Sequence, residues 1–202
     1  MKIKTIEYSD NRELIIVDDA VSKDKRINIY FDCCVMPYRI SNSSVDEIQG
    51  IVDRRLKADL TNDNPIVDLL IEEGTDSSEI IKKYIPSESY GFSRGYVNLG
   101  IHGDVSHMHT DGKYYDAKTV LYYANQHWEY NWGGNTVFYD NDGNAKTNVE
   151  VKPGRIVIFD GSIMHTVMPM NIRSSPSYRF TVALKFETLK LPKFDKRTLE
   201  NG

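Results

Sequence analysis

The spacing of hydrophobic and polar residues changes near residue 90 and divides the chain into two halves. In the first half, a short apolar run at residues 14–17 predicts a strand, and apolar residues farther on recur at the spacing of a helix. Ser22 is a suitable N-cap for the first helix, and a helix break is expected near Gly74. The predicted helices cover residues 23–34, 45–56 and 66–84.

After residue 90 the period becomes two, because short runs of β-branched and aromatic residues alternate with polar ones. Turn sequences such as Pro153-Gly154 and Asp160-Gly161-Ser162 separate these runs. Seven short strands with turns at such intervals predict a β-sandwich or jelly roll, with the N-terminal helices on one outer face. The predicted strands cover residues 93–99, 119–125, 135–139, 149–152, 155–159, 164–168 and 179–186.

Composition excludes several classes of protein. Of the 202 residues, 40% are hydrophobic, and the longest apolar runs have four residues, so we expect no transmembrane helix. The N-terminal residues lack the apolar core of a secretory signal. With 25 Lys and Arg against 29 Asp and Glu, the net charge is −4, which argues against a protein that holds nucleic acid. We therefore expect neither a nucleic-acid nor a membrane partner.

Cysteine content bears on the cellular compartment. Cys33 and Cys34 are adjacent, and the chain has no other cysteine that could pair with them. A disulfide framework is therefore excluded, which predicts a reducing, cytoplasmic location. The pair could act as a redox switch, but two small residues buried in an apolar stretch are the simpler interpretation.

Candidate chemistry is concentrated in the β half. Residues i and i+2 of a strand point to the same face, so His109 and Asp111 are placed to bind one metal ion together. His165, 56 residues after His109, begins a predicted strand and is the candidate third ligand. Two imidazoles and one carboxylate suit non-haem Fe(II), because they leave positions open for a co-substrate and dioxygen. The alternative for His109 and Asp111 is a hydrogen-bonded pair in a loop.

An arginine in the last predicted strand is the second candidate feature. Arg179 stands 14 residues after His165, and alternation places Arg179 and Thr181 on the face opposite Phe180. A guanidinium that faces an apolar barrel needs an anion, and its planar fork suits a carboxylate. The alternative is an exposed arginine on an edge strand.

Tyr123 is a candidate partner for the same carboxylate. If Leu121 points into the barrel, then Thr119 and Tyr123 do so as well, since all three share one face of the predicted strand. The Tyr123 hydroxyl could then donate to the carboxylate that Arg179 binds. Otherwise Tyr123 is a core residue whose hydroxyl is satisfied by a neighbour.

Together these residues resemble the Fe(II)- and 2-oxoglutarate-dependent dioxygenases, in the prolyl 4-hydroxylase-like branch. The resemblance covers roughly residues 90–187, and the order of the motifs is as informative as their content. Some relatives have Lys in place of Arg179, and many have Glu in place of Asn135, so the substrate is left open. The matching motifs are His109-Thr110-Asp111, Leu121-Tyr122-Tyr123-Ala124-Asn125, Trp128, Trp132-Gly133-Gly134-Asn135-Thr136-Val137-Phe138, Val151-Lys152-Pro153-Gly154-Arg155, Phe159, His165 and Arg179-Phe180-Thr181.

The resemblance implies a fold and a set of site residues. The fold would be mainly β with flanking α, a double-stranded β-helix or jelly roll covered by N-terminal helices. Residues 1–202 would form a single dioxygenase domain: an N-terminal strand and supporting helices (1–89), a catalytic core (90–187) and a polar tail (188–202). The implied iron ligands are His109, Asp111 and His165. The implied binding residues for the distal carboxylate of 2-oxoglutarate are Arg179, Tyr123 and Thr181.

The implied activity is hydroxylation of an unactivated C–H bond by dioxygen and 2-oxoglutarate, with succinate and CO2 as co-products and ascorbate as a further candidate cofactor. A prolyl residue or related peptide is the nearest substrate, but a small molecule stays open, as does the oligomeric state. The alternative is a non-catalytic, cupin-like jelly roll that binds a metal and a small molecule. Such a structural metal site would not need Arg179. A nucleic-acid demethylase is disfavoured by the net charge.

Overall fold

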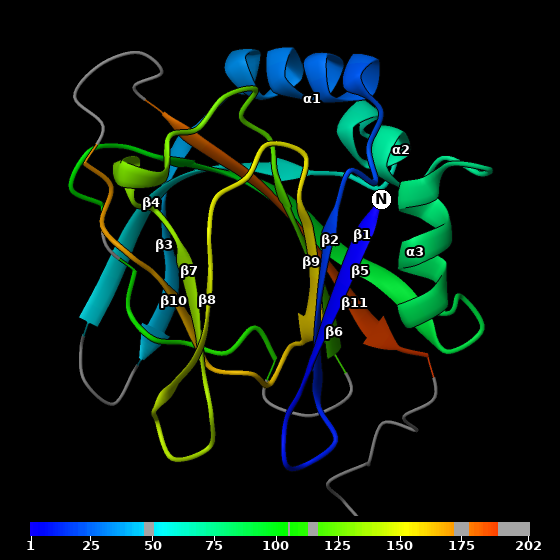
Figure 1. Ribbon diagram of the computed structural model, residues 1–202. Coiled ribbons are helices and arrows are strands. Elements are labelled where there is room, and N and C mark those ends of the chain that lie inside the picture. Colours follow the sequence, from blue (N-terminus) through cyan, green and yellow to red (C-terminus); the bar gives the residue numbers. More distant parts are fainter. Residues whose placement is uncertain (47–50, 105, 113–116, 172–177, 190–202) are drawn as a thin grey trace, which may run out of the picture.

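The computed structural model describes residues 1–46, 51–104, 106–112, 117–171 and 178–189, and in these parts it contains two antiparallel β-sheets (Figure 1). The strands of the larger sheet are β1 (Lys2–Glu7), β2 (Glu13–Asp18), β3 (Arg39–Asp46), β4 (Ile51–Leu60), β5 (Tyr90–Gly100), β6 (Ala117–Tyr123), β9 (Ile156–Asp160) and β11 (Arg179–Thr188). Their spatial order is β1-β2-β9-β6-β11-β5-β4-β3. The smaller sheet has the order β10-β7-β8, with β7 (Thr136–Tyr139), β8 (Ala145–Val149) and β10 (His165–Val167). The fold class expected from the sequence is therefore confirmed.

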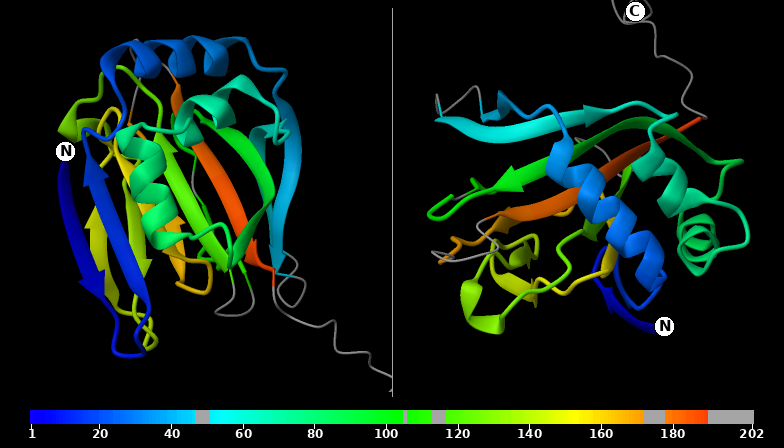
Figure 2. Two further views of the ribbon diagram at one scale, coloured as in Figure 1. Left: turned by 90° about the vertical axis from the view of Figure 1, so that its right-hand side faces the viewer. Right: turned by 90° about the horizontal axis from the view of Figure 1, so that it is seen from above.

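Three α-helices cover one face of the larger sheet, as Figure 2 shows. They are α1 (Lys23–Val35), α2 (Pro65–Ile71) and α3 (Asp76–Tyr84), and a short 3-10 helix, η1 (Tyr130–Trp132), lies in the second half. The Ser22 hydroxyl caps α1 by accepting from the amide of Lys25, as predicted. The predicted break near Gly74 is confirmed, because α2 and α3 are separate helices. No helix among the described residues is long and apolar enough to cross a membrane.

The helix predicted over residues 45–56 is wrong. Residues 39–46 and 51–60 are β3 and β4, and residues 47–50 lie outside the described part of the chain. The physical reason is that β4 pairs with β5, where Leu56 lies opposite Leu99 and Ala58 opposite Val97. Leu56, Ala58 and Leu60 alternate with charged residues, so a period of two was present at the end of the segment.

Two smaller differences concern strands at sheet edges. β1 was not predicted, although Ile3 and Ile6 flank polar residues in a run that pairs fully with β2. β8 covers residues 145–149 rather than the predicted 149–152. Pairing with β7 extends it toward the turn that ends at Asn144, and Val149 is its buried last residue.

The apolar side chains form two clusters on opposite faces of the larger sheet. One cluster fills the space between the helices and the sheet, and it includes Cys33, which is fully buried as expected, whereas Cys34 is exposed. The second cluster lies between the two sheets. β11 contributes to the first through Phe180, Val182, Leu184 and Phe186. Its other face is directed into the space between the sheets, where the candidate site lies.

Candidate active site

A short antiparallel bridge brings His109 beside His165. The backbone amide of His109 donates to the carbonyl of His165 at 3.0 Å, and the reverse bond measures 2.9 Å. The amide of Asp111 donates to the carbonyl of Gly161 at 2.7 Å. Residues 109–111 therefore run as an extended segment alongside the start of β10, so that two motifs far apart in the sequence meet.

The three candidate ligand residues come together as predicted. One ligand atom from each of His109, Asp111 and His165 lies within 4.8 Å of the others. His109 Nε2 is 3.8 Å from Asp111 Oδ1, and His165 Nε2 is 3.7 Å from Asp111 Oδ2. Two nitrogens and a carboxylate thus converge on one point, a donor set that fits a first-row divalent metal ion.

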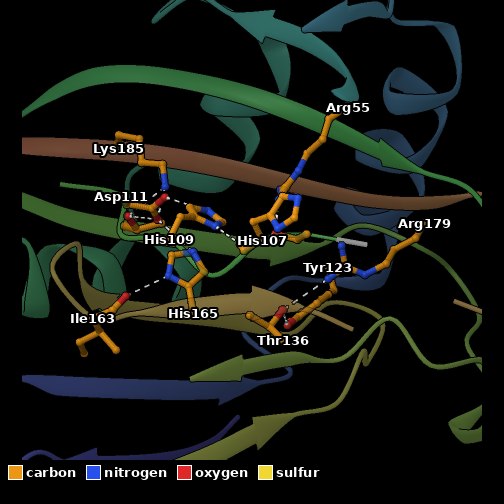
Figure 3. Close-up of polar contacts among 12 residues, drawn as sticks. Arg55, His107, His109, Asp111, Tyr123, Thr136, Ile163, His165, Arg179 and Lys185 are labelled. Atoms are coloured by element: carbon orange, nitrogen blue, oxygen red, sulfur yellow. Dashed lines mark hydrogen bonds and ion pairs between the residues drawn. The ribbon is translucent and has the colours of Figure 1, made fainter. Parts of the chain in front are cut away.

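Both imidazoles are held in the same way. His109 Nδ1 lies 2.9 Å from the carbonyl oxygen of His107, and His165 Nδ1 lies 3.0 Å from that of Ile163, two residues back in each case (Figure 3). A carbonyl can only accept, so each Nδ1 carries the proton. Each Nε2 is then the unprotonated nitrogen, and its lone pair faces the carboxylate.

Burial and charge keep the three groups in the protonation states that metal binding requires. Burial lowers the pKa of His165 to about 4 and also lowers that of His109. Burial alone would raise the pKa of Asp111, but the Lys185 ammonium, which pairs with this carboxylate, outweighs burial and holds that pKa well below its usual range. Two neutral imidazoles therefore face an ionised carboxylate.

Arg179 lies at the other end of the same space and is buried. Its guanidinium carbon is 5.2 Å from the centre of the Tyr123 ring, and its Nη2 donates to Thr136 Oγ1 at 3.5 Å. The Tyr123 hydroxyl lies 2.8 Å from the same Thr136 oxygen. Nε of Arg179 is buried and has no hydrogen-bond partner among the described residues. An unpaired buried donor on a cation fits an anionic ligand such as a carboxylate.

Gly134 explains how the arginine reaches this position. Its φ is +73°, in the left-handed region that favours glycine. A Cβ there would lie 2.9 Å from Met170 Cγ and 3.0 Å from Arg179 Cδ. The second glycine of Gly133-Gly134 thus lets the Arg179 side chain pass close to the backbone.

A pocket of about 740 Å³, open solvent at its mouth included, joins the two ends. Thr181 lines it from β11, between Arg179 and Lys185, whereas Tyr123 is fully buried, does not line the pocket and has its ring against Arg179. Sequence reasoning did not assign roles to Lys185, Thr136 or Arg55, which also line the pocket. Alternation along β11 could have found Lys185, because it shares the face of Arg179 and Thr181. Arg55 fell in the segment wrongly predicted as a helix.

Residues 90–186 match the family model of the 2OG-Fe(II) oxygenase superfamily. This part of the chain belongs to that superfamily. The oxygenase is accordingly an oxidoreductase that uses Fe(II), 2-oxoglutarate and dioxygen. The donor set at residues 109, 111 and 165 and the unpaired Nε of Arg179 fit these two ligands. The non-catalytic alternative is not favoured.

Solved structures share the fold of the oxygenase at low sequence identity. A prolyl-4-hydroxylase from Pseudomonas putida is 14% identical, with a TM-score of 0.63 over 86% of this chain and 91% of that one. HygX from Streptomyces hygroscopicus, with nickel and 2-oxoglutarate bound, is 9% identical, with a TM-score of 0.64 over 92% and 85%. A prolyl hydroxylase from Trichoplax adhaerens, in complex with a hypoxia inducible factor peptide fragment, is 17% identical, with a TM-score of 0.62 over 86% and 83%. No curated protein sequence matches the chain.

Proposed function

We propose that the oxygenase hydroxylates a prolyl residue, or a closely related residue, of a peptide, and that His109, Asp111 and His165 bind the Fe(II) ion. The observation that carries the metal assignment is the convergence of the three ligand atoms within 4.8 Å, with both Nδ1 atoms already engaged by carbonyls. In this arrangement the protein supplies three ligands from one side. Three protein ligands would leave coordination positions available for 2-oxoglutarate and dioxygen.

We propose that Arg179 binds the distal carboxylate of 2-oxoglutarate, with the hydroxyls of Tyr123 and Thr181 as additional candidate donors. Support comes from the buried, unpaired Nε of Arg179 and from its position at the opposite end of the pocket from the metal ligands. Thr136 orients both partners, because its hydroxyl oxygen lies within hydrogen-bond distance of Tyr123 and Arg179. A dicarboxylate anchored there would direct its other end toward the metal ligands.

Several residues of the pocket divide the tasks of this reaction between them. When bound, the iron supplies the redox chemistry that couples cleavage of dioxygen to decarboxylation of 2-oxoglutarate. The histidines and Asp111 hold the metal, Arg179 fixes the co-substrate, and Leu121 and Phe159 line the pocket with apolar surface that excludes water. One oxygen atom enters the substrate C–H bond as a hydroxyl. The other enters succinate, and the 1-carboxylate of 2-oxoglutarate leaves as CO2.

The peptide part of the proposal is supported by the relatives. Two of the three solved structures described above are prolyl hydroxylases, and one of them holds a peptide. The pocket itself offers apolar side chains to a pyrrolidine ring near the backbone of β10 and β5, from Leu99, Val167 and Met170. A ring of this kind carries no charge, so it matches an apolar wall better than a strongly polar substrate would.

The test combines two measurements on purified protein supplied with Fe(II), 2-oxoglutarate and ascorbate. Succinate release reports the oxygenase reaction, and mass spectrometry of a library of proline-containing peptides reports gain of one oxygen atom, with alanine-for-proline peptides as controls. Hydroxylation of the proline peptides alone is expected. Succinate release stimulated by a small molecule instead of any peptide would overturn the peptide assignment. Absence of succinate and of a thermal shift with 2-oxoglutarate would overturn the site assignment.

Two further proposals concern the whole chain. We propose that residues 1–202 form a single dioxygenase domain, supported by the four N-terminal strands that extend the same sheet as β5, β6, β9 and β11. We also propose a cytoplasmic location, supported by the free thiols of Cys33 and Cys34.

A further inference from the structure

Lys185 is a second buried cation in the pocket, and its surroundings are unusual for a lysine. Its side chain is 7% exposed, on the same face of β11 as Arg179. Its ammonium forms an ion pair with Oδ2 of Asp111. It also donates to Thr119 Oγ1 at 3.2 Å, and it lies 5.7 Å from the centre of the Tyr96 ring.

Thr119 completes a closed set of contacts around one carboxylate oxygen. Its hydroxyl accepts from Lys185 and donates to Asp111 Oδ2 at 2.9 Å. Oδ2 therefore receives two donors from two neighbouring strands, β11 and β6, whereas Oδ1 receives no hydrogen bond from the described residues. Oδ1 faces Nε2 of His109 at 3.8 Å, and Oδ2 lies 3.7 Å from Nε2 of His165, so only the two donors distinguish the oxygens (Figure 3).

We propose that Lys185 is a positioning residue for the metal: with Thr119 it holds Oδ2 of Asp111 and thereby presents Oδ1 as the single ligating oxygen. This inference rests on the proposed metal site. Without these two donors the carboxylate could rotate, and Oδ1 would no longer be held where it faces Nε2 of His109. Partners that orient a ligand from outside the coordination sphere commonly change metal affinity about 10- to 100-fold when they are removed.

The contacts of Lys185 distinguish this role from two others. An ammonium that recognised an anionic substrate would be directed at the open pocket, but Lys185 is directed at Asp111 and Thr119. An ammonium that competed with the metal for the carboxylate would weaken metal binding, so its removal would tighten that binding. A positioning role predicts instead that removal of Lys185 weakens metal binding. Metal affinity without 2-oxoglutarate therefore separates these roles.

The experiment is a calorimetric titration of metal-free protein with Mn(II), a divalent ion that needs no reductant. Lys185→Met is expected to weaken Mn(II) binding about 10-fold or more, and Lys185→Arg to recover part of that loss because it keeps the charge. Lys118→Met is the matched control. Lys118 lies on β6 and pairs with Asp160 at 2.6 Å, but it does not line the pocket. The control should bind Mn(II) like the unmodified protein.

Thr119→Val tests the same proposal without removing a charge. It keeps Lys185 but deletes the hydroxyl donor to Oδ2, and a several-fold loss of Mn(II) affinity is expected. At saturating Mn(II), the affinity of Lys185→Met and of Thr119→Val for 2-oxoglutarate should be within about two-fold of that of the unmodified protein, because Arg179 is unchanged. A general loss of folding would lower the 2-oxoglutarate affinity as well, so this measurement separates misfolding from a specific effect on the metal.

The outcomes separate failure of the inference from failure of the proposed function. Unmodified protein that binds no Mn(II) would overturn the metal site itself. Normal Mn(II) binding by the unmodified protein and by Lys185→Met would overturn only the role of Lys185. Tighter binding by Lys185→Met would make Lys185 a competitor, and a selective loss of 2-oxoglutarate affinity would make it a co-substrate ligand; either result overturns the proposal.

Discussion

Two buried cations, Arg179 and Lys185, stand six residues apart on the same face of β11, and their surroundings differ. Lys185 has a carboxylate and a hydroxyl as partners. Arg179 has one long hydrogen bond to Thr136 and an aromatic ring, and no ion pair with any described carboxylate. A buried charge that lacks an opposite charge is costly. The unpaired cation is therefore the one suited to bind an anionic ligand, whereas the paired one is already balanced by a residue of the site.

The largest expected effect comes from removing the carboxylate that distinguishes the two cations. Asp111→Ala deletes a proposed metal ligand and leaves Lys185 without its counter-charge. Succinate formation should fall about 1,000-fold or more, because metal chemistry contributes several kcal/mol to the barrier. The free energy of unfolding of metal-free protein should fall by about 3 kcal/mol, as a buried charge becomes unpaired. Succinate assays and urea denaturation measure the two effects.

The double variant Asp111→Ala/Lys185→Met is the control for this comparison. It removes both charges, so stability should recover while activity stays lost. His127→Ala is the control for activity, because this exposed histidine pairs with Glu129 away from the pocket. Activity retained by Asp111→Ala would show that Asp111 is not a metal ligand.

Arg179→Met should affect 2-oxoglutarate binding without the loss of stability expected for Asp111→Ala. The variant removes a buried charge that no described carboxylate balances, so metal-free protein should be equally stable or more stable. The KM for 2-oxoglutarate should rise about 100-fold, since an ion pair buried in the complex loses one partner. Thermal shifts with 2-oxoglutarate and initial rates measure these effects. An unchanged KM would place the distal carboxylate elsewhere.

The strand that carries both cations also shows what the sequence could predict. The period of two in residues 179–186 predicted β11 and placed Arg179 and Thr181 on one face, and the His-x-Asp spacing placed His109 beside Asp111. These are local patterns, since each depends on residues two positions apart. Lys185 continues the same pattern, but its partner, Asp111, is 74 residues away, and no local pattern names such a partner.

The segment at residues 45–56 failed for a related reason. Its apolar residues recur at a spacing that fits a helix. The segment forms strands because β3 pairs with β4, and β4 with β5, at the edge of the larger sheet. β4 pairs with β5, which follows only after two helices, so the contact that defines it is not local. Arg55 was therefore not recognised as a residue of the pocket.

Thr136→Val is expected to have a moderate effect, limited to the Arg179 end of the pocket. The hydroxyl oxygen of Thr136 is shared by Tyr123 and Arg179, so its loss leaves both less well oriented. One lost hydrogen bond of about 1 kcal/mol corresponds to a roughly five-fold higher KM for 2-oxoglutarate. Mn(II) affinity should not change, because no metal ligand is touched. Steady-state kinetics and the Mn(II) titration are the two measurements, and a loss of Mn(II) affinity would contradict the separation of the two ends.

The smallest expected effect comes from a carboxylate–cation pair that resembles Asp111 and Lys185 but is partly exposed. Asp10 and Arg12 pair at 2.8 Å, and the Asp10 side chain is 22% exposed. Hydrogen bonds from the Arg12 guanidinium lower the pKa of Asp10 from its ordinary 3.8 to about 2. The contribution of the pair to stability is therefore complete above pH 3.8 and is lost as the pH falls through 2.

Asp10→Asn should accordingly lower the free energy of unfolding by less than about 1 kcal/mol at neutral pH, because solvent screens the pair. The difference from the unmodified protein should narrow between pH 6 and pH 3, where the unfolded chain already binds the proton that folded Asp10 still rejects. Urea denaturation of both proteins at the two pH values measures this narrowing. A difference that does not change with pH would contradict this prediction, because it would show that the charge of Asp10 does not cause the difference in stability. Charge would then contribute to stability at the buried pair of Asp111 and Lys185 but not at the partly exposed pair of Asp10 and Arg12.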